Sequence, residues 1–289
     1  MHPPTIEFFN YTIGTEHGRM AYRQWSQAGS AKPWLICAHG LNQNSRHLEA
    51  LANRLADDFN ILVPDFPGRG LSDYLTDKLS YSYLFYVPLC QSLIEQLKLG
   101  EIYWLGTSMG GLTGLLLASL PNTPVKKLVL NDIGPIIPKA TMQAAAFAGT
   151  VADVRFASIA EAQEKLAPML AVSGITDPAM KEAYIRASLR QEPNGSWRPD
   201  NDQGIYHYTK VMPEFNSADL PFWQYWHSLR CPVLLLHGVH SNTLTPEIIA
   251  EMKKCRPDIE VVDIPDTGHA PHLMNDEQAE LVRHWLLRA

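Results

Sequence analysis

The chain has 289 residues, 46% of them hydrophobic, and a formal net charge of −6 at pH 7, which fits a globular α/β protein with an insertion. Acidic and basic residues are interspersed without a basic stripe, so nucleic acid is not expected as a partner. No apolar run approaches the about 18 residues that a membrane span needs, and no secretory signal is visible at the N-terminus.

Residues 34–132 alternate short apolar runs with helix-like segments. Strands are predicted at 34–40, 59–68, 102–108 and 125–132, and helices at 46–58, 87–100 and 111–121. Leu48, Leu51 and Leu55 lie at helical spacing, and Gly100 and Pro121 are typical helix ends. Because continuously apolar strands that alternate with helices are typical of parallel sheets covered on both faces, we predict an α/β fold with a mostly parallel, doubly wound sheet.

The alternation stops after Gly134 and resumes after His227. Helices are predicted at 140–149, 159–170 and 178–189, and a turn-rich aromatic stretch follows at 191–208. Two further strand segments, 231–238 and 259–270, and a final amphipathic helix at 276–289 complete the chain. These patterns predict a first core part at 1–133, a helical insertion at 134–227 and a second core part at 228–289.

The sharpest motif is Gly106-Thr107-Ser108-Met109-Gly110, which fits G-x-S-x-G. An apolar strand leads into this pentapeptide and an apolar helix leaves it, which is the setting of a nucleophile elbow with a serine on a strained turn. An ordinary glycine-rich turn that binds an anion at a helix N-terminus is the alternative.

Three other features favour the elbow. His39 and Gly40 follow a predicted strand, so that the N–H of Leu41 and the N–H of Met109 are candidates for holding an oxyanion. A tight loop, 64–73, follows the next strand. His269 follows the last strand, and the carboxyl ends of parallel strands share one edge, where a base can reach a serine.

With these motifs the sequence resembles the α/β-hydrolase fold enzymes. The matching pieces, which cover about two-thirds of the chain, are HGLNQN, PDFPGRGLSD, LGTSMGG, LVLNDIGP, CPVLLLHG and DTGHAPHL. The resemblance implies that Ser108 is the nucleophile, that His269 is the general base, and that the N–H groups of Met109 and Leu41 form the oxyanion hole. It implies a structural role for His39, and Asn42 is a further candidate for the oxyanion or substrate site.

The resemblance also makes residues 134–227 a cap over the active site. Its aromatic residues are candidates for lining a substrate pocket, and Trp223 in particular is expected to bind substrate, although packing of the cap onto the core is the favoured role for any single one. They are Trp197, Tyr206, Tyr208, Phe222, Trp223 and Trp226.

The acid of the triad is open at this point. The resemblance places it three or four residues beyond Gly238, at Ser241 or Asn242, where this chain has no carboxylate. Asp132, after the strand at 125–132, is slightly favoured as the acid, although a shift of one residue in the alignment would put Asn131 there. Asn242 is the alternative, because an amide oxygen can accept the Nδ1–H of a histidine; an altered or engineered position 242 is a third explanation.

Asp266, in the loop of His269, is a distant third acid and a better candidate for a turn residue. His237, His240 and His272 match no metal motif, so neither a metal nor a cofactor is expected.

We therefore expect a serine hydrolase of a carboxylic ester or related acyl bond, with a small-molecule acyl or ester substrate. A C–C bond hydrolase, lactonase or thioesterase would use the same residues. The Asn at position 242 leaves open an impaired enzyme or a ligand-binding protein on the same fold. The chain has four widely spaced cysteines and no CxxC pair, which favours a reduced compartment and therefore a cytoplasmic protein: Cys37, Cys90, Cys231 and Cys255. A monomer or a homodimer is expected.

Overall fold

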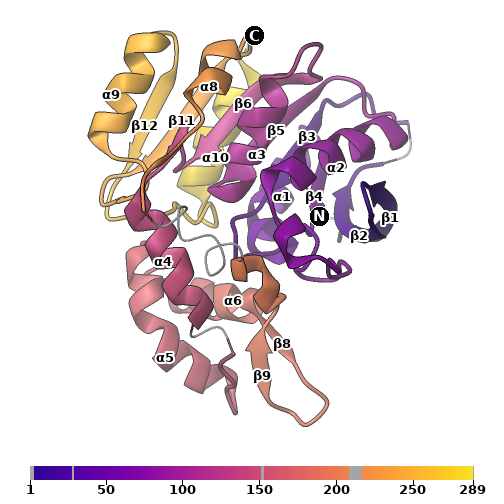
Figure 1. The fold of residues 1–289 in the computed structure, drawn as a ribbon, viewed down its shortest axis with the longest axis vertical. Helices are drawn as coiled ribbons and strands as arrows, with labels where there is room; N and C mark the ends of the chain where they lie inside the picture. The colour runs from indigo at the N-terminus through magenta and orange to yellow at the C-terminus, as the bar shows by residue number, and fades with distance from the viewer. Residues whose placement is uncertain (1–2, 28, 151–152, 208–216, 289) are drawn as a thin grey trace.

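The centre of the molecule is an eight-stranded sheet (Figure 1). The computed structural model describes residues 3–27, 29–150, 153–207 and 217–288. In chain order the strands of this sheet are β1 (Thr5–Ile13), β2 (Glu16–Trp25), β3 (Trp34–Ala38), β4 (Asn60–Pro64), β5 (Ile102–Thr107), β6 (Val125–Asn131), β11 (Val233–Gly238) and β12 (Glu260–Ile264). They lie in the order β1-β2-β4-β3-β5-β6-β11-β12. β1 and β2 are antiparallel to their neighbours and the other strands are parallel, which confirms the predicted mostly parallel sheet.

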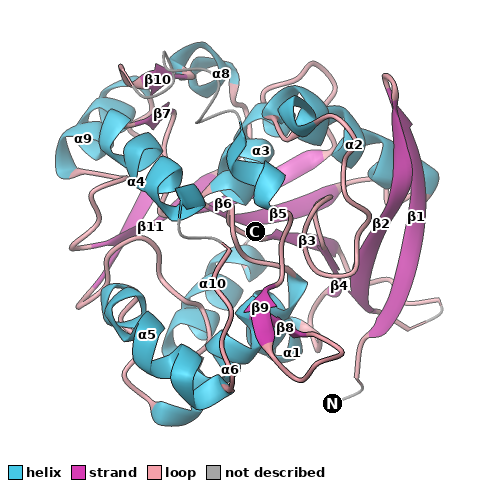
Figure 2. Cartoon of the chain, turned by 60° about the horizontal axis from the view of Figure 1, so that its bottom comes forward, coloured by secondary structure: helices cyan, strands magenta, loops and turns pink. Residues whose placement is uncertain are grey.

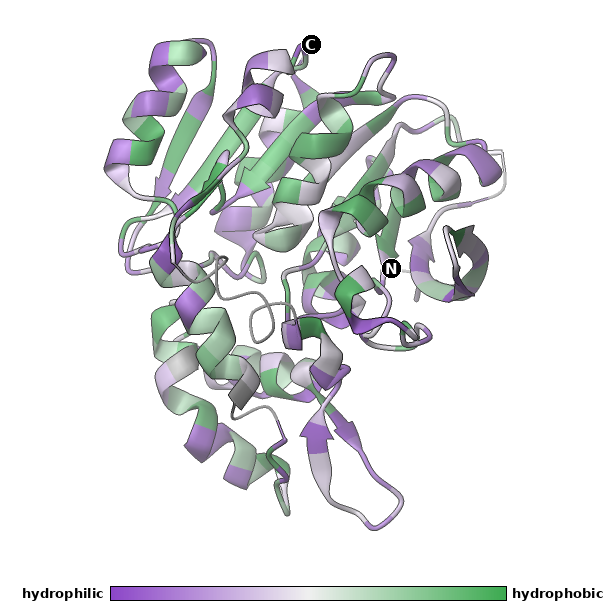
Figure 3. Ribbon diagram, viewed as in Figure 1, coloured by the Kyte–Doolittle hydropathy of each residue, from purple (hydrophilic) through white to green (hydrophobic). Residues whose placement is uncertain are grey.

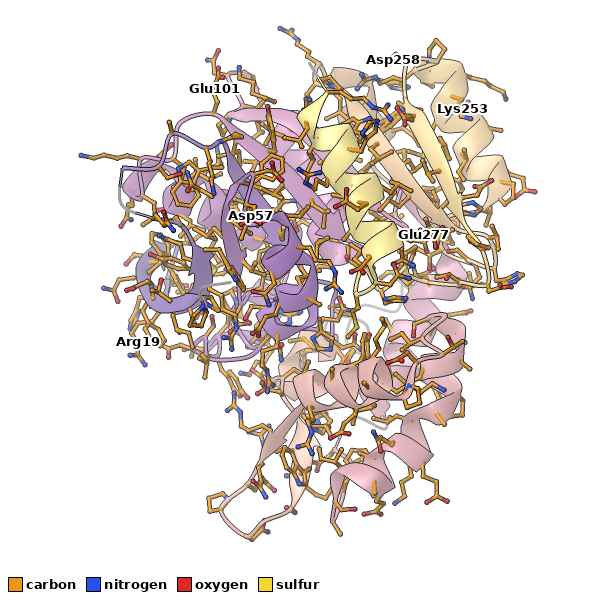
Figure 4. All side chains as sticks on the ribbon, turned by 180° about the vertical axis from the view of Figure 1, so that it is seen from behind. Arg19, Asp57, Glu101, Lys253, Asp258 and Glu277 are labelled. Atoms are coloured by element: carbon orange, nitrogen blue, oxygen red, sulfur yellow. The ribbon has the colours of Figure 1, made fainter. Side chains whose placement is uncertain are left out.

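Helices cover both faces of the sheet. α1 (Glu49–Leu55) and α10 (Asp276–Leu287) lie on one face, and α2 (Tyr83–Gln96), α3 (Met109–Ala118) and α9 (Pro246–Cys255) lie on the other. Along β3 the side chains alternate, since Leu35 and Cys37 pack with α1 and α10 while Ile36 packs with α2 and α3. The central strands are correspondingly mostly apolar (Figure 3). Six charged residues labelled in Figure 4 lie at the periphery of this core: Arg19, Asp57, Glu101, Lys253, Asp258 and Glu277.

Residues 134–227 separate β6 from β11. They contain α4 (Lys139–Thr150), α5 (Ile159–Val172), α6 (Pro178–Ser188) and α8 (Trp223–Ser228), with short strands β7 (Ile136–Ile137), β8 (Leu189–Gln191), β9 (Trp197–Pro199) and β10 (Leu220–Pro221). The 3₁₀ turns are η1 (Ser45–Leu48), η2 (Lys78–Ser80) and η3 (Gln203–Tyr206). α4, α5, α6 and the β8–β9 hairpin project below the carboxyl ends of the parallel strands (Figures 1 and 2).

The inserted segment has a small apolar core of its own and a polar attachment to the sheet domain. Phe156, Leu170 and Ile185 are buried in that core. The attachment centres on Asp200, whose carboxylate accepts hydrogen bonds from Arg46 (2.7 Å) and Arg190 (2.7 Å). Because Asp200 is 6% exposed, these charge-assisted bonds fix the hairpin against the loop after β3.

Three features differ from, or add to, the sequence prediction. β1 and β2 were not predicted, since β1 buries only Phe9 and Tyr11 and so shows little apolar alternation. The inserted segment contains the paired strands β7–β10 and β8–β9 in addition to helices. The predicted boundary after residue 227 falls inside α8, whose Trp226 is fully buried in the same core cluster as α3. In the described part of the chain no helix is long and apolar enough to cross a membrane.

Candidate active site

Ser108 lies between the last residue of β5 and the first residue of α3. Its backbone φ of 50° and ψ of −114° lie outside the usual regions for a residue with a side chain. The turn needs glycine on both sides: a Cβ on Gly106 would lie 2.3 Å from the Gly110 carbonyl carbon, and one on Gly110 would lie 2.4 Å from the Ala38 carbonyl oxygen. This strained strand-to-helix turn is the geometry of a nucleophile elbow.

A chain of hydrogen bonds runs from Ser108 through His269 to Asp132. His269 Nε2 lies 2.9 Å from Ser108 Oγ, and His269 Nδ1 lies 2.6 Å from Asp132 Oδ2. Asp132 is fully buried and the His269 side chain is 23% exposed. With Nδ1–H donated to the carboxylate, Nε2 is free to accept the proton of Ser108.

Asp132 is held in place by the loop that follows β11. Its Oδ1 accepts the Gly238 N–H at 2.9 Å, and its Oδ2 accepts the Ser241 hydroxyl at 2.6 Å. The Asp132 backbone has a φ of 57°, and its N–H donates to the Leu236 carbonyl at 2.8 Å. One buried carboxylate thus accepts a backbone N–H, a hydroxyl and an imidazole N–H, which satisfies its acceptors away from water.

The other acid candidates lie elsewhere. The structure does not bring Asn242 together with His269: Asn242 is exposed, and no hydrogen bond joins the two within the described residues. Asn131 donates its Nδ2 to Thr107 Oγ1 (2.9 Å) and to the Pro271 carbonyl (2.8 Å), so it anchors the His269 loop to β5. Asp266 is an exposed residue with a φ of 53°, which suits a turn.

Leu41 and Met109 lie beside Ser108. Both line the cavity that contains Ser108, and among the described residues no acceptor is paired with either backbone N–H. Both are therefore available to a bound oxygen atom.

Arg69, from the loop after β4, contacts both of these residues. Its Nε donates to the Leu41 carbonyl at 2.9 Å and its Nη2 approaches Met109 Sδ at 3.5 Å. Its Nη1 donates to the Pro67 carbonyl (2.8 Å) and to Tyr86 Oη (2.7 Å). Arg69 is fully buried, none of the ion pairs in the described ranges includes it, and its guanidinium lies 5.5 Å and 5.6 Å from the ring centroids of Tyr81 and Tyr86.

His39 has the structural role that was expected. Nδ1–H donates to the Gly40 carbonyl at 2.8 Å and Nε2 accepts the Phe66 N–H at 3.0 Å, so both nitrogens of the neutral ring are used. Burial lowers the pKa of His39 to about 3, which keeps the ring neutral at physiological pH.

A cavity of about 260 Å³ opens beside Ser108, here called the Ser108 cavity. Its lining comes from the loop after β3, from η2 and α2, from α3 and from α4, and is mostly apolar: Leu41, Leu79, Tyr81, Ser82, Tyr83, Leu84, Tyr86, Ser108, Met109, Ile133, Ile137, Thr141, Met142, Ala145 and Leu220. Such a lining suits the hydrocarbon part of a small substrate.

Asn42 and Trp223 are not among the described residues that line this cavity. Asn42 is exposed and lines a second cavity of about 340 Å³, here called the Lys165 cavity. Trp223 is half-buried against the core near α3. Trp223, which was predicted to bind substrate, packs against the core in this structure, because α8 lies on the sheet domain.

The other candidate aromatic residues mostly pack as well. Phe222 and Trp226 lie against the main core, and Trp197 lies against the small core of the inserted segment. Tyr206 lines the Lys165 cavity. Tyr208 is outside the described residues.

Sequence reasoning gave no role to Arg69, which lies in the quoted PDFPGRGLSD motif, and considered Ser241 only as a position for the acid. The helix predicted at 87–100 also begins four residues too late, so the first turn of α2, whose Tyr83 and Leu84 line the Ser108 cavity, was missed. The available signal for Ser241 was its position three residues after Gly238, where the resemblance places the acid. A hydroxyl group at that position can donate a hydrogen bond to a carboxylate that comes from another strand. Arg69 carried no such signal, since burial of a charged residue is decided by the tertiary structure.

Comparisons with known proteins agree with this geometry. A family model described as alpha/beta hydrolase fold matches residues 33–276. A 3-hydroxybutyrate-oligomer hydrolase of Cupriavidus necator is 35% identical over 266 residues, which cover 90% of each chain. An esterase of Mycobacterium tuberculosis is 25% identical and covers 92% of this chain and 84% of its own.

Among solved structures, an alpha/beta hydrolase from Novosphingobium aromaticivorans superposes with a TM-score of 0.87 at 27% identity and covers 100% of both chains. The likeness therefore includes the inserted segment as well as the sheet.

Proposed function

The chain belongs to the alpha/beta hydrolase fold family, a family of hydrolases, and on that premise we propose that it is a serine hydrolase of carboxylic esters that acts through an acyl-enzyme. The observation that carries the proposal is the hydrogen-bonded chain Ser108–His269–Asp132 at the edge of an apolar cavity. Two free backbone N–H groups beside the serine support it.

The proposed reaction proceeds in two halves. Ser108 Oγ attacks the ester carbonyl while His269 Nε2 takes its proton, and the N–H groups of Leu41 and Met109 donate to the developing oxyanion. His269 then returns the proton to the leaving alcohol. A water molecule, deprotonated by His269, attacks the acyl-enzyme and releases the acid. Asp132 holds the imidazole in the tautomer that accepts at Nε2 and stabilises the imidazolium that forms.

The acid in this proposal is Asp132, and Asn242 has no part in the reaction. The carboxylate comes from the end of β6 and is held by Ser241 and Gly238 from the loop after β11. With a carboxylate already bonded to His269, the Asn at position 242 is no argument for an impaired enzyme or for a ligand-binding protein.

The proposed substrate is an ester of a short hydroxy acid. The similar hydrolase of Cupriavidus necator is named for 3-hydroxybutyrate oligomers, in which esters join four-carbon units. A cavity of about 260 Å³ with an apolar lining suits an acyl group of that size. In this proposal residues 134–221 form the cap, since α4 and the β10 residue Leu220 lie over the cavity.

The test is hydrolysis of ethyl butanoate and of 3-hydroxybutyrate dimers by the purified chain and by Ser108→Ala. We expect turnover by the wild type and a loss of at least about 10³-fold in the variant. An alkyl fluorophosphonate is expected to add one mass increment to the wild type and none to Ser108→Ala. Turnover that survives in a folded Ser108→Ala would overturn the proposal, and so would its absence on all of these esters.

A further inference from the structure

The Lys165 cavity lies next to the Ser108 cavity and shares two supporting elements with it. Leu41 lines the Ser108 cavity, and the next residue, Asn42, lines the Lys165 cavity. On α4, Ala145 lines the first and Ala148 lines the second. Residues three apart lie on the same side of a helix, so the two cavities follow one another along α4. The loop that carries the Leu41 N–H separates them, because neighbouring residues of this loop line different cavities.

The lining of the Lys165 cavity differs in kind from that of the Ser108 cavity. Its lining residues include Lys165, whose side chain is 55% exposed, together with Asn42, Asn201 and Tyr184. No Asp or Glu is found in this lining among the residues that the structure describes. A cavity with one cation, several hydrogen-bond donors and no lining carboxylate favours an anionic ligand.

Asn201 marks the cavity as a binding site. Asn201 is 6% exposed, and its side-chain Oδ1 is buried with no hydrogen-bond partner among the described residues. Oxygen and nitrogen of an amide are assigned from their surroundings, so a rotation of this amide by 180° places its Nδ2 donor, which a carboxylate can accept, at the unpartnered position. A buried polar atom without a partner costs free energy that a bound polar group recovers.

Tyr184 and Lys165 retain unused donors. Tyr184 Oη accepts Gln43 Nε2 at 3.1 Å, which leaves its own O–H to donate, and burial raises the pKa of Tyr184, so the hydroxyl stays protonated. Lys165 Nζ lies 2.6 Å from Glu161 Oε1. Glu161 also accepts the Ala157 N–H at 2.6 Å, so part of its charge is taken up by the backbone and Lys165 keeps two N–H donors.

We propose that the Lys165 cavity binds a carboxylate at the end of the ester substrate remote from the acyl group in the Ser108 cavity. The protein then prefers esters whose alcohol part ends in a free carboxylate, as in an oligomer of a hydroxy acid, and cleaves them near that end. This inference rests on the proposed function, since it assigns the two ends of the same substrate to two cavities.

The test uses two substrates of equal size that differ in charge. 3-(Butanoyloxy)butanoic acid carries the carboxylate, and 3-(butanoyloxy)butanamide carries a neutral amide in its place. For the wild type we expect kcat/KM to be about tenfold higher for the acid, as one ion pair between partly exposed groups supplies, with the difference mainly in KM. This preference is expected to shrink as NaCl is raised from about 0.05 to about 0.5 M, because salt screens the attraction between partly exposed charges.

Lys165→Met is expected to bring the ratio of acid to amide to about one, while Lys253→Met, on exposed α9, leaves it unchanged. Asn201→Ala is expected to raise KM for both substrates. Lys165→Met and Lys253→Met should hydrolyse ethyl butanoate at wild-type rate, because in this proposal its ethyl group does not reach the Lys165 cavity.

Two failures are distinguishable. If ethyl butanoate is hydrolysed in a Ser108-dependent way but the acid is not preferred, or if Lys165→Met keeps the preference, the carboxylate site is refuted and the proposed function stands. If no ester is hydrolysed, the proposed function itself fails.

Discussion

Asp132 and His269 are 137 positions apart in the chain, yet Asp132 Oδ2 lies 2.6 Å from His269 Nδ1. The contact forms because β6 is hydrogen-bonded to β5 on one side and to β11 on the other. The residue after β6 therefore lies between the turn that carries Ser108 and the loop after β11. Ser241, from that loop, donates to the same carboxylate oxygen that accepts from His269.

Exchange of the acid candidates separates Asp132 from Asn242. Asp132→Asn is expected to lower kcat by about 10⁴-fold, because an amide that donates to His269 favours the wrong tautomer. Asn242→Asp, at an exposed position, is expected to leave kcat within about twofold of the wild type. The measurement is steady-state hydrolysis of ethyl butanoate with near-UV circular dichroism as a control for folding. A large gain in Asn242→Asp would contradict the assignment.

Ser241 is predicted to support Asp132. Ser241→Ala removes a hydroxyl that donates to a buried carboxylate at 2.6 Å and is expected to lower kcat by about tenfold, the range of one hydrogen bond to a charged group. Ser241→Thr keeps the hydroxyl and should retain more of the wild-type kcat. Equal losses in the two variants would show that packing, and not the hydrogen bond, matters at this position.

Arg69 is predicted to position the two oxyanion donors. Arg69→Met is expected to lower kcat by about 10- to 100-fold with KM within about twofold, since aligned N–H groups act on the transition state more than on the bound ester. A boronic acid that mimics the tetrahedral intermediate should lose affinity in parallel.

Arg46→Met is the matched control for Arg69→Met. Arg46 is a partly buried arginine that bonds to Asp200 and makes no recorded hydrogen bond to Leu41 or Met109. The Arg46→Met variant should have a lower free energy of unfolding without a selective loss of kcat. A similar kinetic loss in both variants would assign Arg69 a purely structural role.

The stability of the fold is predicted to fall in mild acid. Burial is the main cause that lowers the pKa of both His39 and His47 to about 3, from an ordinary value of 6.5. Below pH 6.5 both histidines are protonated in the unfolded chain but stay neutral in the folded chain. Each histidine therefore contributes stability that is fully present above pH 6.5 and is lost as the pH falls toward 3.

Urea unfolding between pH 7 and 4.5 measures this loss. Each histidine contributes a slope that approaches about 1.4 kcal/mol per pH unit below its unfolded pKa. His47→Gln should unfold with a shallower pH dependence than the wild type, even if it is less stable at pH 7. An unchanged slope in that variant would exclude His47 as a source of the acid sensitivity.

The sequence alone determined the parts of this protein that depend on neighbouring residues. A strand–Gly-x-Ser-x-Gly–helix segment folds into an elbow because only glycines fit beside Ser108, and apolar strands between helices form a sheet buried on both faces. The motif at 106–110 and the histidine at 269 follow from such local patterns.

Only the tertiary structure decided which acid meets His269. β6 and β11 are adjacent, so the residues after both strands lie at the same edge of the sheet, and the sequence favoured Asp132 over Asn242 only slightly. The fold buries Asp132 and leaves Asn242 exposed. The burial of Arg69 and the two neighbouring cavities were likewise beyond local reasoning, because each depends on side chains that come from segments far apart in the chain.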